Sequence, residues 1–415
     1  MPDRRHPESL AVNLNSGLDA SRFPGWLVIL GALTAIGPLS IDMYLPAFAA
    51  IEQDLHAPAG GAELTLAGFF IGMACGQLVW GPLSDRFGRI PPLFAGLTLF
   101  AIATLGCALT DNITSLIAWR LLQALGGSAG MVIARAVVRD RCSARESARA
   151  FSTLILVMGL APILAPIIGG WVVSAFNWRA IFFLLFAFAL ACLLAIRFGL
   201  QESHSTRHEP PLNALRIGRD YASLFASRAF LGYTLSGGLA MAGMFAYIAG
   251  SPFVLIQLGG IAPKHFGWAF GINALGFIIA SQLNARSLKT IAPTAMLRHA
   301  LWVPALAGLI LAGLTFSGTA TLPLTLLCMF LYVASLGFIA PNSSASALAT
   351  HGQRAGTASA LMGALQFGLA TLTGVGISRL HDGTAGPLAL LLAVCGVGAW
   401  LLHRWLVHPH DQHLG

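Results

Sequence analysis

Charged residues are scarce in this chain. Asp, Glu, Lys and Arg make up 10% of its 415 residues, whereas hydrophobic residues make up 56%. Soluble globular domains carry about 25% charged residues, so this chain lacks the ionic surface that would cover a core of its size in water. The shortage excludes a cytosolic enzyme, a secreted protein and a disordered protein, and it indicates an integral membrane protein.

The motifs of several site classes are also missing. The six cysteines form no Cys-x-x-Cys pair and no His/Cys cluster, so we expect neither a disulfide framework nor a metal site. No segment matches G-x-x-x-x-G-K-[ST], the loop that binds nucleotide phosphates, so ATP is not expected as the energy source. Most of the 12 histidines lie in tails and loops, which disfavours an intramembrane enzyme. The first 24 residues contain no apolar stretch of the kind found in a signal peptide.

Twelve apolar runs are long enough to cross a bilayer, which takes about 20 residues in a helix. They form two sets of six, separated by a segment rich in His, Arg and Pro. We therefore expect an all-α membrane protein with an N-terminal half (1–200), a cytoplasmic linker (201–228) and a C-terminal half (229–415). Transporters built from parallel repeats have this layout, with the substrate site between the halves. The expected spans are residues 25–47, 64–84, 91–109, 113–137, 151–174 and 178–200 in the first half, and 229–257, 265–284, 296–316, 321–345, 356–380 and 385–407 in the second.

The distribution of basic residues predicts the orientation. With the N-terminus in the cytoplasm, 20 of the 24 Lys and Arg residues fall in cytoplasmic segments, three lie outside, and Arg120 lies within a span. Positive loops face the cytoplasm in membrane proteins, so we expect both termini there. The same rule explains the net charge of +8 without a nucleic-acid partner.

A compact loop motif, GPLSDRFGR, joins the second and third expected spans at residues 81–89. Glycine permits a tight chain reversal, and the acid can cap a helix or pair with an arginine. A generic positive loop is the alternative, but the spacing is particular. The residues that we single out as a cytoplasmic gate motif are Gly81, Asp85, Arg86, Gly88 and Arg89.

This motif resembles the loop signature G-x-L-x-D-R-x-G-R-[RK] of the major facilitator superfamily. The chain departs from the signature after Arg89, where Ile90 and Pro91 replace the further basic residue, and the equivalent loop of the second half is degenerate. The resemblance implies the major facilitator fold of twelve helices in two six-helix halves.

Two ionisable residues are expected within spans, Asp42 and Arg120. An arginine in an apolar helix costs about 2.5 kcal/mol or more, so it should face the bundle interior, unless it snorkels to the outer surface. Both residues lie roughly 8–10 Å deep in the membrane. Desolvation raises the pKa of a carboxyl group and a nearby arginine lowers it, so a carboxyl group under both influences can take up and release a proton. We predict Asp42 as the proton carrier and Arg120 as its electrostatic partner; alternatively, Asp42 caps the break before Pro46 or faces the outer vestibule. The acids that we place in outer loops are Glu52, Asp54, Glu63, Asp111 and Asp382.

Further stretches extend the resemblance. RLLQALGG (120–127) is similar to the superfamily's R-x-x-Q-G-x-G motif, which implies a link between Arg120 and proton translocation. GLAPILAPIIGG (159–170) is similar to G-x-x-x-G-P-x-x-G-G, a motif associated with exporting antiporters; small-residue packing is the alternative. IDMYLP (41–46), AGSPFVL (249–255) and GFIAPN (337–342) look like the Bcr/CflA drug-resistance transporters. The residues of the antiporter-type motif are Ala161, Ala165, Pro166, Gly169 and Gly170.

Polar, aromatic and Met residues within spans are candidates for the lining of a substrate cavity, which would suit partly apolar compounds. Each of them alone is more often a helix-packing residue. The candidates are Tyr44, Gln123, Met241, Phe245, Tyr247, Asn273, Asn342 and Gln366, together with Phe69 and Gln77.

The leading functional hypothesis is a proton-coupled exporter of hydrophobic or amphiphilic small molecules across the bacterial inner membrane. The alternative is an importer or facilitator of a small metabolite with the same fold. In either case we expect no cofactor, energy from the proton gradient, the lipid bilayer and a small-molecule substrate as partners, and function as a monomer.

Overall fold

The computed structural model describes residues 25–142, 144–203, 214–349 and 355–407. Over these residues twelve helices are long and apolar enough to cross a membrane, which confirms the expected number of spans and the all-α class. The first six spans comprise α1 (Gly25–Asp42) with η1 (Leu45–Ala47) and α2 (Phe48–Asp54), then α3 (Gly61–Phe87), α4 (Ile90–Leu109), α5 (Ile113–Arg141), α6 (Ala144–Ala175) and α7 (Trp178–Gly199). After α8 (Ala214–Ala226), the second six comprise α9 (Arg228–Pro252) with η3 (Phe253–Leu258), then α10 (Pro263–Ser287), α11 (Pro293–Ala300) with α12 (Trp302–Phe316), α13 (Leu322–Ala349), α14 (Ala355–Arg379) and α15 (Gly386–Leu406).

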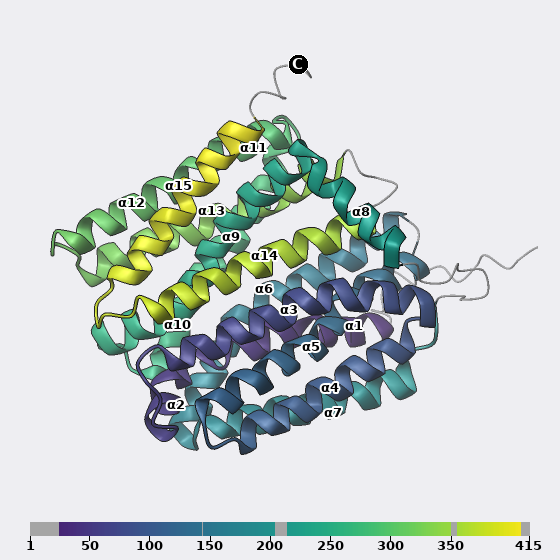
Figure 1. Ribbon diagram of the computed structural model, residues 1–415, viewed down its shortest axis with the longest axis horizontal. Helices are drawn as coiled ribbons and strands as arrows, with labels where there is room; N and C mark the ends of the chain where they lie inside the picture. Colours follow the sequence, from purple (N-terminus) through teal and green to yellow (C-terminus); the bar gives the residue numbers. More distant parts are fainter. Residues whose placement is uncertain (1–24, 143, 204–213, 350–354, 408–415) are drawn as a thin grey trace, which may run out of the picture.

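The two sets of six helices lie side by side, with the long helices running roughly in one direction (Figure 1). We call the end of the bundle where α1 begins the inner end, and the opposite end, where α2 lies, the outer end. The seam between the sets is made by α3 against α14 and by α6 against α10. At the outer end η1 also contacts α9 and α10, so the halves meet there through their first and seventh spans as well.

Local sequence signals explain where several of these helices begin and end. The Asn112 side chain accepts a hydrogen bond from the Ser115 amide at the start of α5, and Asn177 does the same for Ala180 at the start of α7. Such caps satisfy backbone donors that a helix leaves unpaired. Gly88 ends α3 with a φ of +85°, a conformation that glycine adopts most readily.

Some boundaries differ from the expectation. Helix α5 continues to Arg141, and α6 starts at Ala144 instead of residue 151, because hydropathy marks only the apolar part of a helix that extends beyond the membrane core. The expected linker contains the helix α8. Helix α3 begins at Gly61, three residues before the expected span, and this brings Glu63 into the span.

Candidate functional site

Arg120 lies in the interior of the first half, and its side chain is fully buried. Its guanidinium donates one hydrogen bond to the Gln123 side-chain oxygen (2.6 Å) and another to the Ser40 carbonyl of α1 (3.0 Å). Gln123 in turn donates to the Thr104 hydroxyl of α4 (2.8 Å). The arginine therefore joins α1, α4 and α5, and it does not snorkel to the membrane surface.

Aromatic rings enclose the same guanidinium. Its central carbon lies 4.6 Å from the ring centre of Tyr44, 4.3 Å from that of Phe69 and 5.9 Å from that of Phe182. The Tyr44 hydroxyl shares a 2.8 Å hydrogen bond with Thr65. Cation–π attraction strengthens where water is excluded, so these rings help to hold the charge in the interior. Of the predicted residues, the structure brings together Arg120, Gln123, Tyr44 and Phe69.

Asp42 is the last residue of α1 and is 3% exposed. The structure does not bring it together with Arg120: the described residues form no ion pair between them. The reason is angular, because Asp42 is two residues beyond Ser40 and so lies about 200° around the helix from it, although the depth matches. Asp42 lies instead within electrostatic range of Tyr247 on α9, in the second half.

Tyr247 and Asn273 form a buried polar pair on the second half. The Asn273 amide donates a 2.7 Å hydrogen bond to the Tyr247 hydroxyl, and the Tyr247 ring stacks on Phe270 with ring centres 5.3 Å apart. Both polar residues were predicted to line a cavity. They place hydrogen-bonding groups of α9 and α10 opposite the end of α1 that carries Asp42.

Three phenylalanines meet across the seam between the halves. Phe245 on α9 lies 4.7 Å from Phe70 on α3 and 5.6 Å from Phe367 on α14, measured between ring centres. Of these three, only Phe245 was predicted from the sequence. The other two could not be separated by sequence from the many phenylalanines that pack within one half.

The remaining cavity candidates have other surroundings. Asn342 donates hydrogen bonds to the side-chain oxygen of Asn284 (2.7 Å) and to the Phe338 carbonyl (2.8 Å), so it joins α13 to α10. Met241 and Gln366 are half-buried on α9 and α14. Gln77 donates a long, 3.9 Å hydrogen bond to the Met131 sulfur, and its side chain packs against Gly363 of α14.

The loop motif forms a charge network at the inner end. Arg89 is 5% exposed and bonds to Asp85 (2.5 Å) and Asp140 (2.7 Å), which joins the loop to the end of α5. Burial disfavours the charged guanidinium, but the hydrogen bonds and charges of Asp140 and Asp85 outweigh it, so the pKa of Arg89 is raised. Arg86 is half-buried, and Gly81 has open space around its α-carbon.

Glu202, just after α7, completes this network. Its carboxylate accepts hydrogen bonds from the backbone amides of Arg89 (2.8 Å) and Ile90 (3.0 Å) at the start of α4. An anion is stabilised at a helix N-terminus. A β-carbon at Gly88 would lie 2.7 Å from the Glu202 carboxylate, so the motif glycine makes room for an acid that sequence analysis missed.

The glycines of the α6 motif lie against backbone at the outer end. A β-carbon at Gly169 would lie 2.0 Å from the Met43 carbonyl oxygen, and one at Gly170 would lie 2.5 Å from the Pro263 carbonyl oxygen of α10. Ala165 and Pro166 are buried next to them, and Ala161 is 7% exposed. Small residues here let α6 approach both the end of α1 and the second half.

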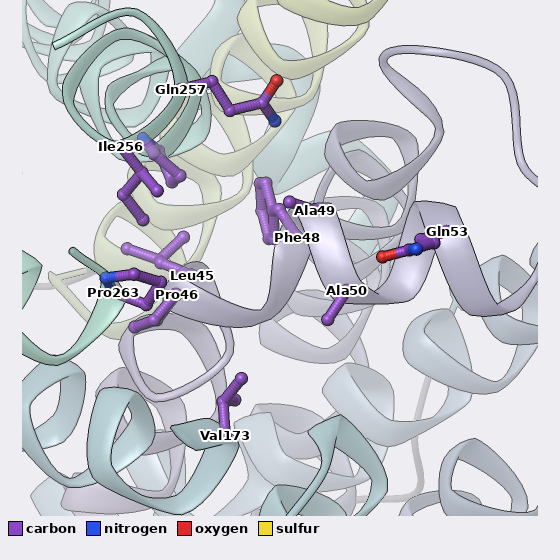
Figure 2. A pocket seen from close by; sticks show the side chains of 11 residues that line it. Leu45, Pro46, Phe48, Ala49, Ala50, Gln53, Val173, Ile256, Gln257 and Pro263 are labelled. Carbon is purple, nitrogen blue, oxygen red and sulfur yellow. The ribbon is translucent and has the colours of Figure 1, made fainter. Parts of the chain in front are cut away.

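A pocket of about 220 Å³ lies at the outer end of the seam (Figure 2). It is lined mainly by apolar side chains of η1, α2 and η3, and by Gln53 and Gln257. None of the predicted cavity residues lines it.

Glu63 corrects the prediction that Asp42 is the single acid within a span. It lies in the first turn of α3 and is 3% exposed, and one of its carboxyl oxygens has no hydrogen-bond partner. The overlooked sequence signal is the Gly60–Gly61 pair. Gly60, in the left-handed conformation, is the N-cap residue, and α3 begins at Gly61, two residues before the acid.

Comparison with known proteins identifies relatives over nearly the whole chain. The family profile of the Major Facilitator Superfamily matches residues 30–375. The uncharacterized MFS-type transporter YdgK of Bacillus subtilis is 36% identical over 89% of this chain and 92% of its own length. The bicyclomycin resistance protein homolog of Haemophilus influenzae is 32% identical over 94% and 98%. Multidrug resistance protein D of Escherichia coli is 28% identical over 90% and 94%.

Solved structures give the same fold. The crystal structure of a D-xylose–proton symporter superimposes with a TM-score of 0.71 over 92% of this chain and 98% of its own, at 15% sequence identity. At that identity the likeness concerns the fold and not the substrate. The predicted twelve-helix fold is therefore confirmed.

Proposed function

Because this chain belongs to the major facilitator superfamily, and is thus a multi-pass membrane transporter and not an enzyme, we propose that it is a proton-coupled exporter. Its cargo would be hydrophobic or amphiphilic small molecules, moved out of a bacterial cytoplasm in exchange for protons. The observation that carries the proposal is the buried carboxyl group of Asp42, which lies within electrostatic range of Tyr247 in the second half.

Two observations favour export over import. Relatives that cover most of this chain are named for resistance to bicyclomycin and to multiple drugs. The small residues of α6 let that helix pack directly on the end of α1 and on α10, and the motif that they resemble is associated with antiporters. The D-xylose–proton symporter at 15% identity bears on the fold alone.

Asp42 would carry the proton between the two sides. A buried, unpaired carboxylate is strongly disfavoured, so Asp42 would be neutral while it is sealed against the second half. When the halves rock apart on one side, water reaches the carboxyl group and the proton can leave. Tyr247 and Asn273, which are hydrogen-bonded to each other opposite the end of α1, would form part of the polar lining that Asp42 meets.

Arg120 would act as a fixed cation and not as a salt-bridge partner. Its guanidinium is held by Gln123, by the Ser40 carbonyl and by the Tyr44 and Phe69 rings. A bond to the α1 backbone two residues before Asp42 couples the position of that carboxyl to α5. The charge would favour release of the proton whenever Asp42 becomes hydrated.

The inner end of the bundle would face the cytoplasm and carry the loop that guides the motion of the two halves. We assign both termini and the Arg89 network to the cytoplasmic side, from the distribution of basic residues. The network would position the α3–α4 loop during the motion, with residues 1–200 and 229–415 moving as the two halves and 201–228 linking them. A monomer would suffice, because the site lies between two halves of one chain.

A drug-susceptibility panel tests the proposal. A pump-deficient strain that expresses the chain should gain resistance to several amphiphilic compounds, and a protonophore should abolish the gain. An Asp42→Asn variant should insert normally and give no resistance, whereas Asp111→Asn, which changes an acid that is 92% exposed, should behave like the wild type. Unchanged susceptibility to every compound would contradict export.

Vesicle orientation separates the two candidate directions of transport. An exporter accumulates its substrate in inverted vesicles that are energised by respiration. An importer of a small metabolite accumulates it in right-side-out vesicles instead.

A further inference from the structure

A second buried carboxyl group, that of Glu63, lies at the outer end of the seam. Glu63, in the first turn of α3, lines a small pocket. The other walls of the pocket come from the second half: from the end of α9 and from η3, from the end of α14 and the loop that follows it, which carries His381, and from the start of α15. The pocket holds about 10 Å³, too little for a hydration shell. The second half therefore covers this acid.

The surroundings of Glu63 favour its neutral form. One of its carboxyl oxygens is buried with no hydrogen-bond partner. Glu52 of α2 accepts a 3.2 Å hydrogen bond from the amide of Ala62, the residue before Glu63, and lies within electrostatic range of the Glu63 carboxyl group. Two neighbouring carboxylates repel each other, which favours a neutral Glu63.

The other titratable groups nearby do not supply a counter-charge. Tyr44, at the start of η1, lies within electrostatic range of Glu63 but is a phenol that shares its hydrogen bond with Thr65. His381 lines the same pocket, and its ring packs edge-on against Phe253, with ring centres 4.4 Å apart. Among the described residues no ion pair joins His381 to Glu63.

The contact that buries Glu63 is the one that closes the outer end. Three residues before it, the Gly60 carbonyl accepts a 2.6 Å hydrogen bond from the Ser378 hydroxyl of α14. A β-carbon at Gly60 would lie 2.7 Å from the Ser378 carbonyl oxygen, so the start of α3 lies directly on α14. Separation of the halves at this end would expose Glu63 to water.

We propose that Glu63, with Glu52, is a proton-binding site that controls the outer gate. A protonated Glu63 fits the closed gate, whereas an ionised Glu63 requires water and therefore the open gate. Acid outside should hold the gate closed, and alkaline conditions should open it. The proposal goes beyond the proposed function because it concerns the gate and not the cargo, and it can fail while export through Asp42 stands.

Distances between spin labels at the outer end test this proposal without any substrate. Labels are attached at Thr114→Cys on α5 and Ala320→Cys before α13, both exposed, in full-length chain that lacks the six native cysteines and is reconstituted in lipid nanodiscs. The wild type should show the shorter distance at pH 5 and a growing longer-distance population toward pH 9. Glu63→Gln, which imitates the protonated acid, should keep the short distance throughout.

A matched control is Asp382→Asn, on the same side of the membrane. Asp382 is fully exposed, and its hydrogen bonds from Thr384 lower the pKa of that carboxyl, so it stays charged over this pH range and its loss should leave the distance change intact. Glu52→Gln provides a second variant if Glu63→Gln does not fold: removal of the neighbouring acid should move the midpoint of the change to lower pH by about 1–2 units. The proposal is overturned by a wild type that does not respond to pH, by a Glu63→Gln variant that still responds, or by an unmoved midpoint in Glu52→Gln.

Discussion

Replacement of Gly169 by alanine probes the contact on which the α6 motif depends. The new β-carbon would lie 2.0 Å from the Met43 carbonyl oxygen and 2.8 Å from its carbonyl carbon. An ordinary contact needs about 3.4 Å, so α6 and the end of α1 must separate by about 1.4 Å (3.4 − 2.0). The obstacle is backbone, which no side-chain rotation relieves. Overpacking of this kind costs about 1–3 kcal/mol or more, and the displaced segment is next to Asp42.

The assay compares thermal unfolding in detergent with the rate of drug export per unit of inserted protein. Gly169→Ala should unfold several degrees below the wild type and export at a rate reduced about tenfold or more, since 1.4 kcal/mol corresponds to a factor of ten. Gly313→Ala in α12 is the matched control, because no heavy atom lies within 4 Å of its β-carbon position and alanine favours a helix by up to about 1 kcal/mol. If Gly169→Ala matched the wild type in both measurements, the packing argument for the motif would be refuted.

Three further substitutions test the rest of the site. Arg120→Lys loses the planar fork that bonds in two directions, at about 1.5–3 kcal/mol per charge-assisted bond, so initial export rates should fall roughly tenfold to a hundredfold; wild-type rates would contradict the fixed-cation role. Gly88→Ala forces a φ of +85° on a residue with a β-carbon and crowds Glu202, at about 1–3 kcal/mol, so its thermal midpoint should drop; an unchanged midpoint would count against the inner network. Tyr247→Phe leaves the buried Asn273 amide without its acceptor and should lower the free energy of unfolding by about 1–3 kcal/mol. Adding Asn273→Leu should restore most of that loss. A double variant less stable than the single variant would contradict the pairing.

The fold could be predicted because the bilayer requires each membrane-spanning helix to be apolar along its whole length. Each span needs about 20 apolar residues, and a few polar substitutions do not hide that signal, so all twelve spans were found. The interior position of Arg120 followed from the high cost of a charge in lipid.

The faces of the helices were harder to predict than their depths. Asp42 and Arg120 lie at similar depth, but Asp42 forms no ion pair with Arg120 among the described residues and lies within electrostatic range of Tyr247 in the second half. Only the packing between helices decides how α1 is rotated. Glu63 was misplaced because an acid near a loop was assigned to the loop, whereas α3 begins at Gly61. Glu202 and Phe367 meet their partners only through contacts distant in sequence, which no local pattern encodes.

The role of Asp42 is tested most directly by proton movement in inverted vesicles. A pH-sensitive fluorescent dye reports the gradient that respiration builds, and the compound with the largest gain in the resistance panel is then added. Wild-type vesicles should release part of the gradient on each addition, and Asp42→Asn vesicles with equal amounts of inserted protein should release none. If the asparagine variant released protons as the wild type does, Asp42 would not be the group that couples transport to the gradient.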